Sequence, residues 1–433
     1  MRYAFLILLI GLLAKDVLPL GDRHLLRGVS EGIALAVGVG WLVTHWSGAV
    51  ARRYGLILSY LSILALTAIC SQRPFFVLLQ VLSLVSVVLF FVAYIESSGI
   101  KQDAFRWNVF AVSCAFLFVC VGSLVLLAVR PPLAFEVTSE GNRFRGLFNE
   151  PAMMGAVSGL LVGLVAFGKF HWLVRIAGAL ASLPCLYLTG SRTSWGAALA
   201  ALLITGALYI TNKRQWIVGL AFMGIVGGVS LVMFDFRMDA DVQSQVIRSG
   251  SIETLSGRTV LWDLALKKYQ DSPLLGYGFT AGSDALVADM GDALNAAFGV
   301  SDRSQRKTFS LHNGYLQALL DSGAIGAALY MAILISAIRG MWKYGTECLH
   351  GAEMYSLIFF TVSNVTDTII FGAAVFYEVY FWYLPVLAMS LGVLVPARLA
   401  DGPTSILTEA NELLKENEEV LPKNRRQYPL LQE

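Results

Sequence analysis

The chain has 433 residues, of which 56% are hydrophobic and only 14% charged, and its mean hydropathy is +0.66. These values exclude a soluble domain with an ordinary polar surface and indicate a polytopic membrane protein. The net charge of +2 is divided between two membrane faces, so it identifies no partner, and nothing in the sequence favours nucleic acid.

Apolar runs close to the length of a membrane span recur along the chain and predict an all-α protein of about twelve transmembrane helices. In chain order they cover residues 3–20, 31–48, 55–70, 74–96, 107–129, 151–168, 172–189, 194–211, 215–234, 311–338, 353–373 and 376–397. The first nine fill residues 1–234, and the last three fill residues 311–397. The first run contains Lys15 and Asp16 and lacks a small-residue cleavage pattern, so we expect a retained span.

One long polar segment, residues 235–310, separates the two groups of apolar runs. Loops of this length in compact proteins tend to be functional or disordered. Apolar side chains recur within it at helical spacing (Leu261, Leu264, Ala265 and Tyr269), so we expect a partly helical loop domain. The tail, residues 398–433, is acidic in its middle and basic near its end, which predicts a short cytoplasmic helix followed by disorder.

The distribution of lysine and arginine between the predicted loops indicates the orientation. With both termini in the cytoplasm, every cytoplasmic loop holds two basic residues: Arg52 and Arg53, Lys101 and Arg106, Lys169 and Arg175, Lys213 and Arg214, and Arg339 and Lys343. The short loops 71–73 and 190–193 on the other side hold one each, and only loop 21–30 holds two. This orientation places loops 130–150 and 235–310 on the same face as Arg192.

Two arginines on that face could bind an anionic substrate. Arg192 is flanked by small hydroxyl residues that also bind oxyanions, although a boundary arginine can instead be a simple interfacial anchor. Arg258 begins a helical stretch that ends at Tyr269, where a guanidinium fork and a helix N-terminus both suit a phosphate. The alternative is an interfacial helix whose basic face, formed by Arg258, Lys267 and Lys268, lies in water.

A histidine and a carboxylate on the same face are candidate bases. His312 ends the long loop, and an imidazole suits proton abstraction from a hydroxyl at neutral pH; a purely structural histidine is the alternative. The shorter loop adds Arg143, Arg145 and Glu150. Glu150 followed by Pro151 fits a helix cap, or Glu150 could orient a sugar hydroxyl or replace His312 as the base.

Polar residues inside the predicted spans leave a second class of function open. Gln80, Asp321, Asn364 and Asp367 could line a proton or solute path in a transporter or flippase. They do not repeat as a paired set in two halves, as inverted repeats require. No carboxylate cluster has the spacing of a divalent metal site, and the five cysteines form no CxxC pair, so we expect neither metal nor cofactor.

Five short motifs follow one another along the chain within residues 145 to 335. They are GLFNEP at 146–151, TGSRT at 189–193, Arg258 between Gly257 and Trp262, DSPLLGYG at 271–278 and LHNGYL at 311–316. In this order they resemble the O-antigen ligase and Wzy-type polymerase family. The layout of twelve spans with one large periplasmic loop is similar over the whole chain.

The resemblance implies a metal-independent, inverting glycosyltransferase of the bacterial inner membrane, whose donor is a polyprenyl-diphosphate-linked oligosaccharide. It implies that Arg192 and Arg258 hold the diphosphate and that His312 is the catalytic base. The candidate substrate-binding residues are Arg143, Arg145, Glu150 and Tyr315.

The resemblance leaves the acceptor open. It is a glycan in a polymerase and lipid A core in a ligase, and chain-length regulator and export proteins are candidate partners in addition to membrane lipids. Asn149-Glu150-Pro151 departs from the Asn-Pro pair followed by Asn that is commoner in ligases, which favours a polymerase. A glycan flippase, a solute transporter and a non-catalytic scaffold of a secretion complex are the alternatives from other classes.

Overall fold

The structure is a computed structural model, and it describes most of the predicted helices. The described residues are 5, 8–11, 13, 16–17, 23–98, 102–138, 141–209, 258–289, 311–348, 351–368 and 375–400. The predicted span 215–234, both flanks of the loop 235–310 and the tail beyond Ala400 lie outside these residues.

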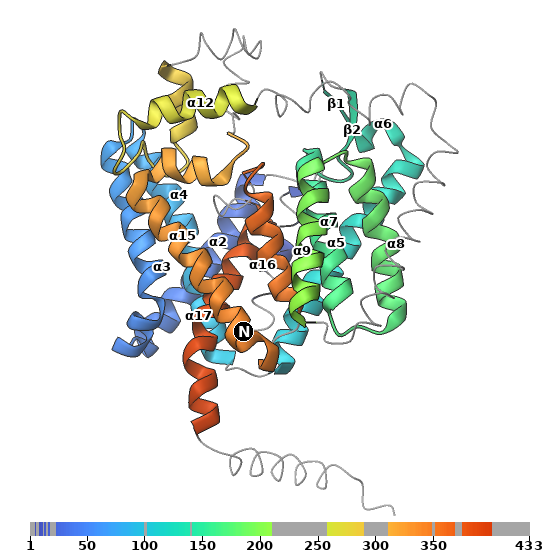
Figure 1. Ribbon diagram of the computed structural model, residues 1–433, viewed down its shortest axis with the longest axis horizontal. Helices are drawn as coiled ribbons and strands as arrows, with labels where there is room; N and C mark the ends of the chain where they lie inside the picture. Colours follow the sequence, from blue (N-terminus) through green and yellow to red (C-terminus); the bar gives the residue numbers. More distant parts are fainter. Residues whose placement is uncertain are drawn as a thin grey trace, which may run out of the picture.

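The described chain forms a bundle of antiparallel helices (Figure 1). The helices are α2 (Arg23–His45), α3 (Gly48–Leu66), the 3₁₀ helix η1 (Thr67–Cys70), α4 (Pro74–Ser98), α5 (Gln102–Val129), α6 (Pro131–Ala134), α7 (Pro151–Phe167), α8 (Trp172–Leu188), α9 (Arg192–Tyr209), α12 (Arg258–Tyr269), α15 (Gly314–Cys348), α16 (Gly351–Ser363) and α17 (Phe376–Ala400). Every predicted span from 31 to 211 and from 311 to 397 overlaps at least one of these helices.

Several of these helices have the length and composition of membrane spans. Five described segments qualify: Arg27–His45, Gly48–Cys70, Pro74–Ser98, Arg106–Val129 and Gly314–Lys343. Pro151–Phe167 and Trp172–Leu188 are shorter apolar helices. The expectation of an α-helical membrane protein is confirmed, and the total of about twelve spans stays a prediction.

Helix α16 is shorter than the apolar run that predicted it. It ends at Ser363, whereas the run continues to residue 373. The sequence TVSNVTDT at 361–368 is rich in side-chain oxygens, and such oxygens compete for backbone N–H groups. Asp367 Oδ1 accepts the Thr368 N–H at 2.9 Å. Residues 364–368 therefore form a turn, here called the α16 turn.

A small β-hairpin qualifies the all-α expectation. Strands β1 (Phe135–Thr138) and β2 (Gly141–Phe144) pair antiparallel, with Phe135 opposite Phe144. The two rings lie edge to face with their centroids 5.8 Å apart, a geometry that stabilises cross-strand aromatic pairs. The hairpin lies at the same end of the bundle as α12 (Figure 1). We call this end the site end.

The bundle has two groups of helices that meet at α16 (Figure 1). In one group α7 packs against α5, α8 and α9; in the other, α15 and α17 pack against each other and against α3, and α17 also contacts α4. Helix α16 contacts α7 and α9 on one side and α15 and α17 on the other. The turn that follows α16 is therefore placed between the two groups.

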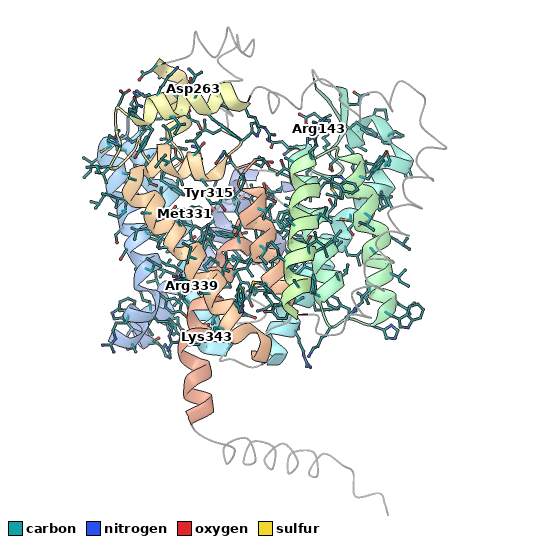
Figure 2. The ribbon with its side chains drawn as sticks, in the orientation of Figure 1. Arg143, Asp263, Tyr315, Met331, Arg339 and Lys343 are labelled. Atoms are coloured by element: carbon teal, nitrogen blue, oxygen red, sulfur yellow. The ribbon has the colours of Figure 1, made fainter. Side chains whose placement is uncertain are left out.

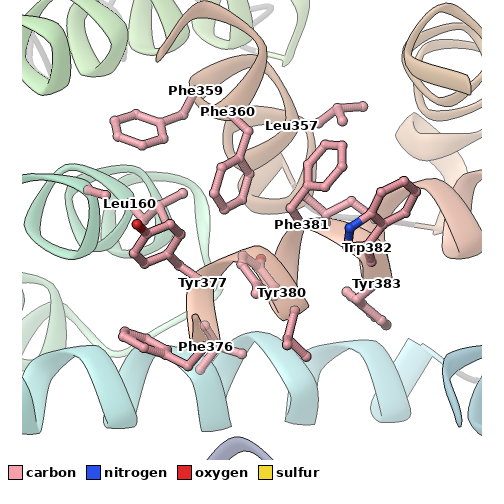
Figure 3. Close-up of a cluster of buried hydrophobic side chains, with 14 of the residues drawn as sticks. Leu160, Leu357, Phe359, Phe360, Phe376, Tyr377, Tyr380, Phe381, Trp382 and Tyr383 are labelled. Carbon is pink, nitrogen blue, oxygen red and sulfur yellow. The ribbon is translucent and has the colours of Figure 1, made fainter. Parts of the chain in front are cut away.

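Aromatic side chains fill the region where α16 and α17 meet (Figure 3). Phe360 of α16 packs edge to face on Phe381 of α17 with ring centroids 5.6 Å apart. Phe376, at the start of α17, contacts Phe116 of α5 at 5.4 Å and stacks on Phe148 at 5.8 Å. Phe148 belongs to the GLFNEP motif, so this packing fixes the loop that leads to Glu150.

A second, smaller apolar core joins α12 to α15. Its buried residues are Leu261, Ala265, Leu286, Leu311 and Leu320. This core confirms the predicted helix and its apolar face. The alternative of a basic face entirely in water is wrong for Lys268, which is buried, pairs with Asp271 (3.2 Å) and Asp289, and lies 4.6 Å from the centre of the Tyr277 ring.

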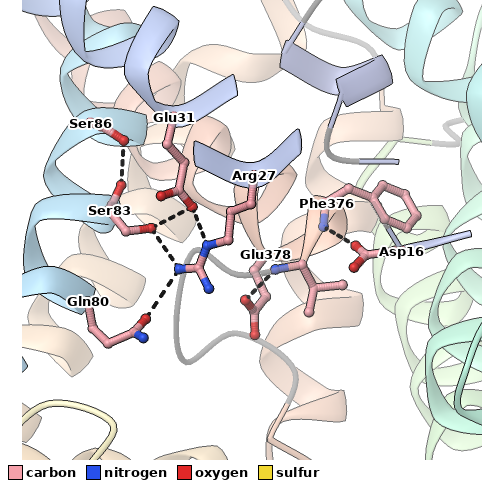
Figure 4. A network of polar contacts seen from close by, with 9 residues as sticks. Asp16, Arg27, Glu31, Gln80, Ser83, Ser86, Phe376 and Glu378 are labelled. Carbon is pink, nitrogen blue, oxygen red and sulfur yellow. Dashed lines mark hydrogen bonds and ion pairs between the residues drawn. The ribbon is translucent and has the colours of Figure 1, made fainter. Parts of the chain in front are cut away.

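A polar network joins α2 to α4 (Figure 4). Arg27 pairs with Glu31 through a 2.7 Å contact and donates hydrogen bonds to Gln80 at 3.3 Å and Ser83 at 3.1 Å. Ser83 donates to Glu31 at 2.8 Å. Charged groups within apolar helices are costly unless paired, so this network accounts for Gln80 in its span.

Candidate functional site

The α16 turn contacts three segments that are distant in the sequence. The carbonyl of Thr366 accepts a hydrogen bond from Arg258 Nη1, and the Thr366 hydroxyl lies 2.9 Å from the hydroxyl of Thr193. Asp367 Oδ1 lies 3.5 Å from His312 Nδ1. One turn therefore contacts Arg258, His312 and the direct neighbour of Arg192.

Arg258 is the first residue of α12 and is half-buried. Its bond to the Thr366 carbonyl fixes one edge of the guanidinium, which carries five N–H donors in a rigid fork. Its charge also acts on Asp367, which lies in the same turn as Thr366. An arginine held in this way at a helix N-terminus suits a phosphate oxygen.

Arg192 is exposed at the first position of α9. Ser191 precedes it, and its hydroxyl oxygen accepts the Ser194 N–H at 3.3 Å, which caps the helix. Gly190 has a φ of +60°, a left-handed conformation that favours glycine and turns the chain from α8 into α9. The TGSRT motif therefore presents its arginine at the site end of the bundle.

His312 is held by contacts of its neighbours within the LHNGYL motif, on both sides of the histidine. The Gly314 N–H donates to the carbonyls of Asn364 (2.9 Å) and Asp367 (3.1 Å), and the Trp262 indole donates to the Leu311 carbonyl at 2.9 Å. His312 itself has a φ of +50°, which is uncommon for a residue other than glycine and is found at functional sites. Its side chain is 48% exposed, so a substrate hydroxyl could reach the ring.

Asp367 is the site residue whose role the sequence did not predict. The sequence marks it only as a polar group within a predicted span. Burial raises the pKa of its carboxyl, but the hydrogen bond and charge of His312, the Thr368 N–H and the charge of Arg258 outweigh burial and hold that pKa below its usual value. The carboxylate is therefore ionised at neutral pH and suited to orient an imidazole through Nδ1.

Glu150 occupies the N-cap position of α7 and Pro151 its first position, as expected, but the Glu150 side chain makes no capping hydrogen bond. Although the residue is exposed, desolvation raises the pKa of its carboxyl; Glu136 and Asp367 raise that pKa further, and His312 lowers it. These interactions place Glu150 within electrostatic range of the His312–Asp367 pair.

The remaining candidates lie around this region. Arg143 lies on β2 (Figure 2). Its Nε donates at 3.4 Å to the carbonyl of Thr189, the first residue of the TGSRT motif. Arg145 donates to the Leu133 carbonyl at 3.3 Å. The Tyr315 hydroxyl donates to the Thr361 carbonyl at 2.7 Å, which braces α15 against α16. Substrate contact by these residues stays a prediction.

Among the described residues, no group of three or more histidine, cysteine, aspartate or glutamate side chains could hold a metal ion. The described charged groups at the site are two arginines, the His312–Asp367 pair and Glu150. Together with the fold, they define a helical membrane protein that has a polar, partly cationic site at one end of its bundle.

Comparison with known proteins identifies the family that this chain resembles. Residues 177–331 match the O-antigen ligase family. The chain is also 28% identical, over 192 residues, to the exopolysaccharide production protein ExoQ of Rhizobium meliloti (strain 1021), and the alignment covers 40% of each protein. The chain thus spans less than half the length of this relative. The resemblance drawn from the five motifs is confirmed, and the matched segment includes Arg192, Arg258 and His312.

Proposed function

We propose that this protein is a polysaccharide polymerase that transfers a polyprenyl-diphosphate-linked glycan to a sugar hydroxyl at the periplasmic face of the bacterial inner membrane. The observation that carries the proposal is the α16 turn, which contacts Arg258, Thr193 and His312 at once. A turn that joins two arginine-bearing helix starts to a histidine suits a reaction between an anionic leaving group and a hydroxyl.

The two arginines act on the donor in the proposed mechanism. Arg192 and Arg258 bind the diphosphate oxygens, for which a guanidinium fork has the matching geometry. When the bond between the anomeric carbon and the diphosphate oxygen breaks, its electron pair leaves with the polyprenyl diphosphate. Fixed positive charges stabilise that developing charge without reorganising, which is often the largest contribution to catalysis.

His312 acts on the acceptor. With its Nδ1–H donated to Asp367, Nε2 carries the lone pair that takes the proton from the acceptor hydroxyl. The hydroxyl oxygen bonds to the anomeric carbon on the face opposite the diphosphate, so the configuration inverts. Asp367 is a positioning residue in this scheme, because it holds the ring and stabilises the imidazolium that forms.

The distribution of basic residues supports the orientation. Arg339 and Lys343 lie toward the end of the bundle opposite Arg143 and α12 (Figure 2). Lysine and arginine are enriched in cytoplasmic loops, so the site end faces the periplasm and both termini are cytoplasmic. We further propose that catalysis is independent of metal and that chain-length regulator and export proteins are partners.

The choice of polymerase rests on the relative named for exopolysaccharide production and on the Asn149-Glu150-Pro151 sequence. The family description favours the second candidate, a ligase that transfers glycan to lipid A core. A flippase or transporter is the third candidate, and it draws on Asp321 and Asp367. The engagement of Asp367 by His312 favours the enzyme.

The deciding experiment incubates purified protein in lipid nanodiscs with a polyprenyl-diphosphate oligosaccharide, with and without lipid A core, and uses His312→Ala as the control. A ladder of longer lipid-linked glycans that the control lacks supports the polymerase. Glycan on lipid A core with no ladder supports the ligase. The enzyme is refuted if neither product forms. A parallel assay in proteoliposomes then supports a flippase if the lipid-linked donor crosses the bilayer.

A further inference from the structure

Helix α15 is interrupted where the DSPLLGYG motif docks on it. Gly323 has φ 64° and ψ −172°, which is not helical. The N–H groups after the break donate instead to the motif, Ala324 to the Pro273 carbonyl (2.8 Å) and Ile325 to the Leu274 carbonyl (3.4 Å). A Cβ on Gly323 would lie 2.2 Å from the Leu274 carbonyl, so only glycine permits this approach.

The motif returns hydrogen bonds to the same break. Tyr277 N–H donates to the Leu320 carbonyl at 3.1 Å, and Gly278 N–H donates to the Asp321 carbonyl at 2.9 Å. The broken helix and the loop therefore satisfy each other's backbone groups. This exchange makes the register of residues 271–282 on α15 specific, because a shift by one residue would leave buried backbone groups unpaired.

The side chain of Asp321 lies at the centre of this junction. It is fully buried, and its two carboxylate oxygens accept three hydrogen bonds. The donors are the Gly282 N–H (2.7 Å), the Thr280 N–H (2.9 Å) and Gln317 Nε2 (2.8 Å). A buried carboxylate needs such partners, and two of the three donors, the Gly282 and Thr280 N–H groups, belong to the docked segment 271–282.

The junction is continuous with the helix that carries Arg258. Helix α12 ends at Tyr269, and the docked motif begins at Asp271. The Tyr277 hydroxyl donates to the Lys268 carbonyl at 2.9 Å, which ties the docked loop back onto the last turn of α12. In its first half, α12 contacts the Leu311 carbonyl through the Trp262 indole, and Leu311 directly precedes His312.

We propose that Asp321 is a positioning residue for the donor, which holds the 271–282 segment on α15 and thereby places Arg258 over the substrate diphosphate. The claim that Asp321 positions Arg258 for the donor rests on the proposed function. The claim that Asp321 anchors residues 271–282 on α15 does not depend on it. It assigns Asp321 a different role from the proton or solute path that an intramembrane aspartate would suggest.

The test uses Asp321→Asn, the milder Gln317→Ala, and Ser322→Ala as the matched control. Ser322 is the buried neighbour of Asp321, and its hydroxyl donates to the Ala318 carbonyl within α15. The asparagine is the same size but turns an N–H₂ group toward backbone donors. The first measurement is hydrogen–deuterium exchange of the amides in residues 276–282 in nanodiscs.

Exchange in this segment should rise about tenfold or more in Asp321→Asn, less in Gln317→Ala and not in Ser322→Ala, while α7 and α9 keep wild-type protection. In transfer assays the donor KM should rise about tenfold and kcat should also fall, because Arg258 both binds the diphosphate and stabilises the charge that develops on it. A structural role alone would lower the yield of folded protein and leave the donor KM unchanged.

The outcomes separate this inference from the proposed function. Unchanged exchange in Asp321→Asn overturns the anchoring role, whatever the activity. Raised exchange with an unchanged donor KM overturns the positioning role while the wild-type enzyme still transfers glycan. If Asp321→Asn does not fold, Gln317→Ala decides in the same two measurements. Absence of transfer by the wild-type protein refutes the proposed function, and the exchange data still decide the anchoring.

Discussion

Replacing Asp367 by asparagine tests whether it acts through His312. Asp367 Oδ1 and His312 Nδ1 are 3.5 Å apart, and the two side chains are 15% and 48% exposed; the pair is charged once His312 has taken the acceptor proton. At an effective dielectric constant of about 20, Coulomb's law gives an upper bound of about 5 kcal/mol for a charged pair at this distance. Solvent screening of the half-exposed imidazole reduces the contribution to about 1–2 kcal/mol. We therefore expect kcat to fall by about 5–30-fold.

The assay measures initial rates of glycan transfer at saturating donor for Asp367→Asn, His312→Ala and the double variant. His312→Ala should lose about 10²–10⁴-fold, as expected for a general base. The double variant should be no slower than His312→Ala, because the aspartate has no other catalytic role. Asp263→Asn is the matched control, since Asp263 pairs with Lys267 on the exposed surface of α12. An additive double variant, or a larger loss in Asp367→Asn than in His312→Ala, would refute the reasoning.

Arg192→Lys and Arg258→Lys should each weaken donor binding about tenfold or more although the charge is retained, because lysine lacks the bidentate fork; donor binding like the parent in both variants would move phosphate recognition elsewhere. Glu150→Gln should reduce kcat less than tenfold, since we assign the base to His312, and a loss as large as that of His312→Ala would make Glu150 the base. Transfer should persist in EDTA, and loss that magnesium or manganese restores would contradict the assignment of the diphosphate to arginines. In a variant without native cysteines, Asp263→Cys should react with a membrane-impermeant thiol reagent added from outside. Lys169→Cys should react only after the membrane is permeabilised. The reverse pattern would place the site in the cytoplasm.

The helices were predictable because bilayer thickness limits the length of an apolar run. The prediction was wrong where local hydrogen bonding mattered more than hydropathy. The run 353–373 hides the end of α16 at Ser363, because valine and isoleucine alternate there with threonine, serine, asparagine and aspartate. The β-hairpin was missed for a related reason, since strands of four residues give too short an alternating pattern to stand out.

The site was predictable as residues but not as contacts. Arg192, Arg258 and His312 each stood out by being polar at the boundary of an apolar run. Thr366, which contacts Arg258 and Thr193, has no such signal, because a threonine in a predicted span needs no explanation. The pairing of Asp367 with His312 joins positions 55 residues apart in the chain, and it follows only from the packing of α15 against α16. An intramembrane carboxylate was the one clue to Asp367 that the sequence offered.

The polar residues within spans also bear on the choice between enzyme and transporter. A path for protons or solutes needs polar groups that share one connected route, but the four groups noted in the sequence have separate partners. Gln80 accepts from Arg27 between α2 and α4 (Figure 4). Asp321 holds the docked loop on α15. Asn364 donates to the Tyr330 hydroxyl at 3.3 Å, and Asp367 faces His312.

Of these four groups, only Asn364 and Asp367 adjoin each other, and both belong to the α16 turn. These two lie at the site end, whereas Gln80 and Asp321 join one helix to another or to a loop. The paired groups at the α16 turn suit the proposed transfer of a lipid-linked glycan at one membrane face.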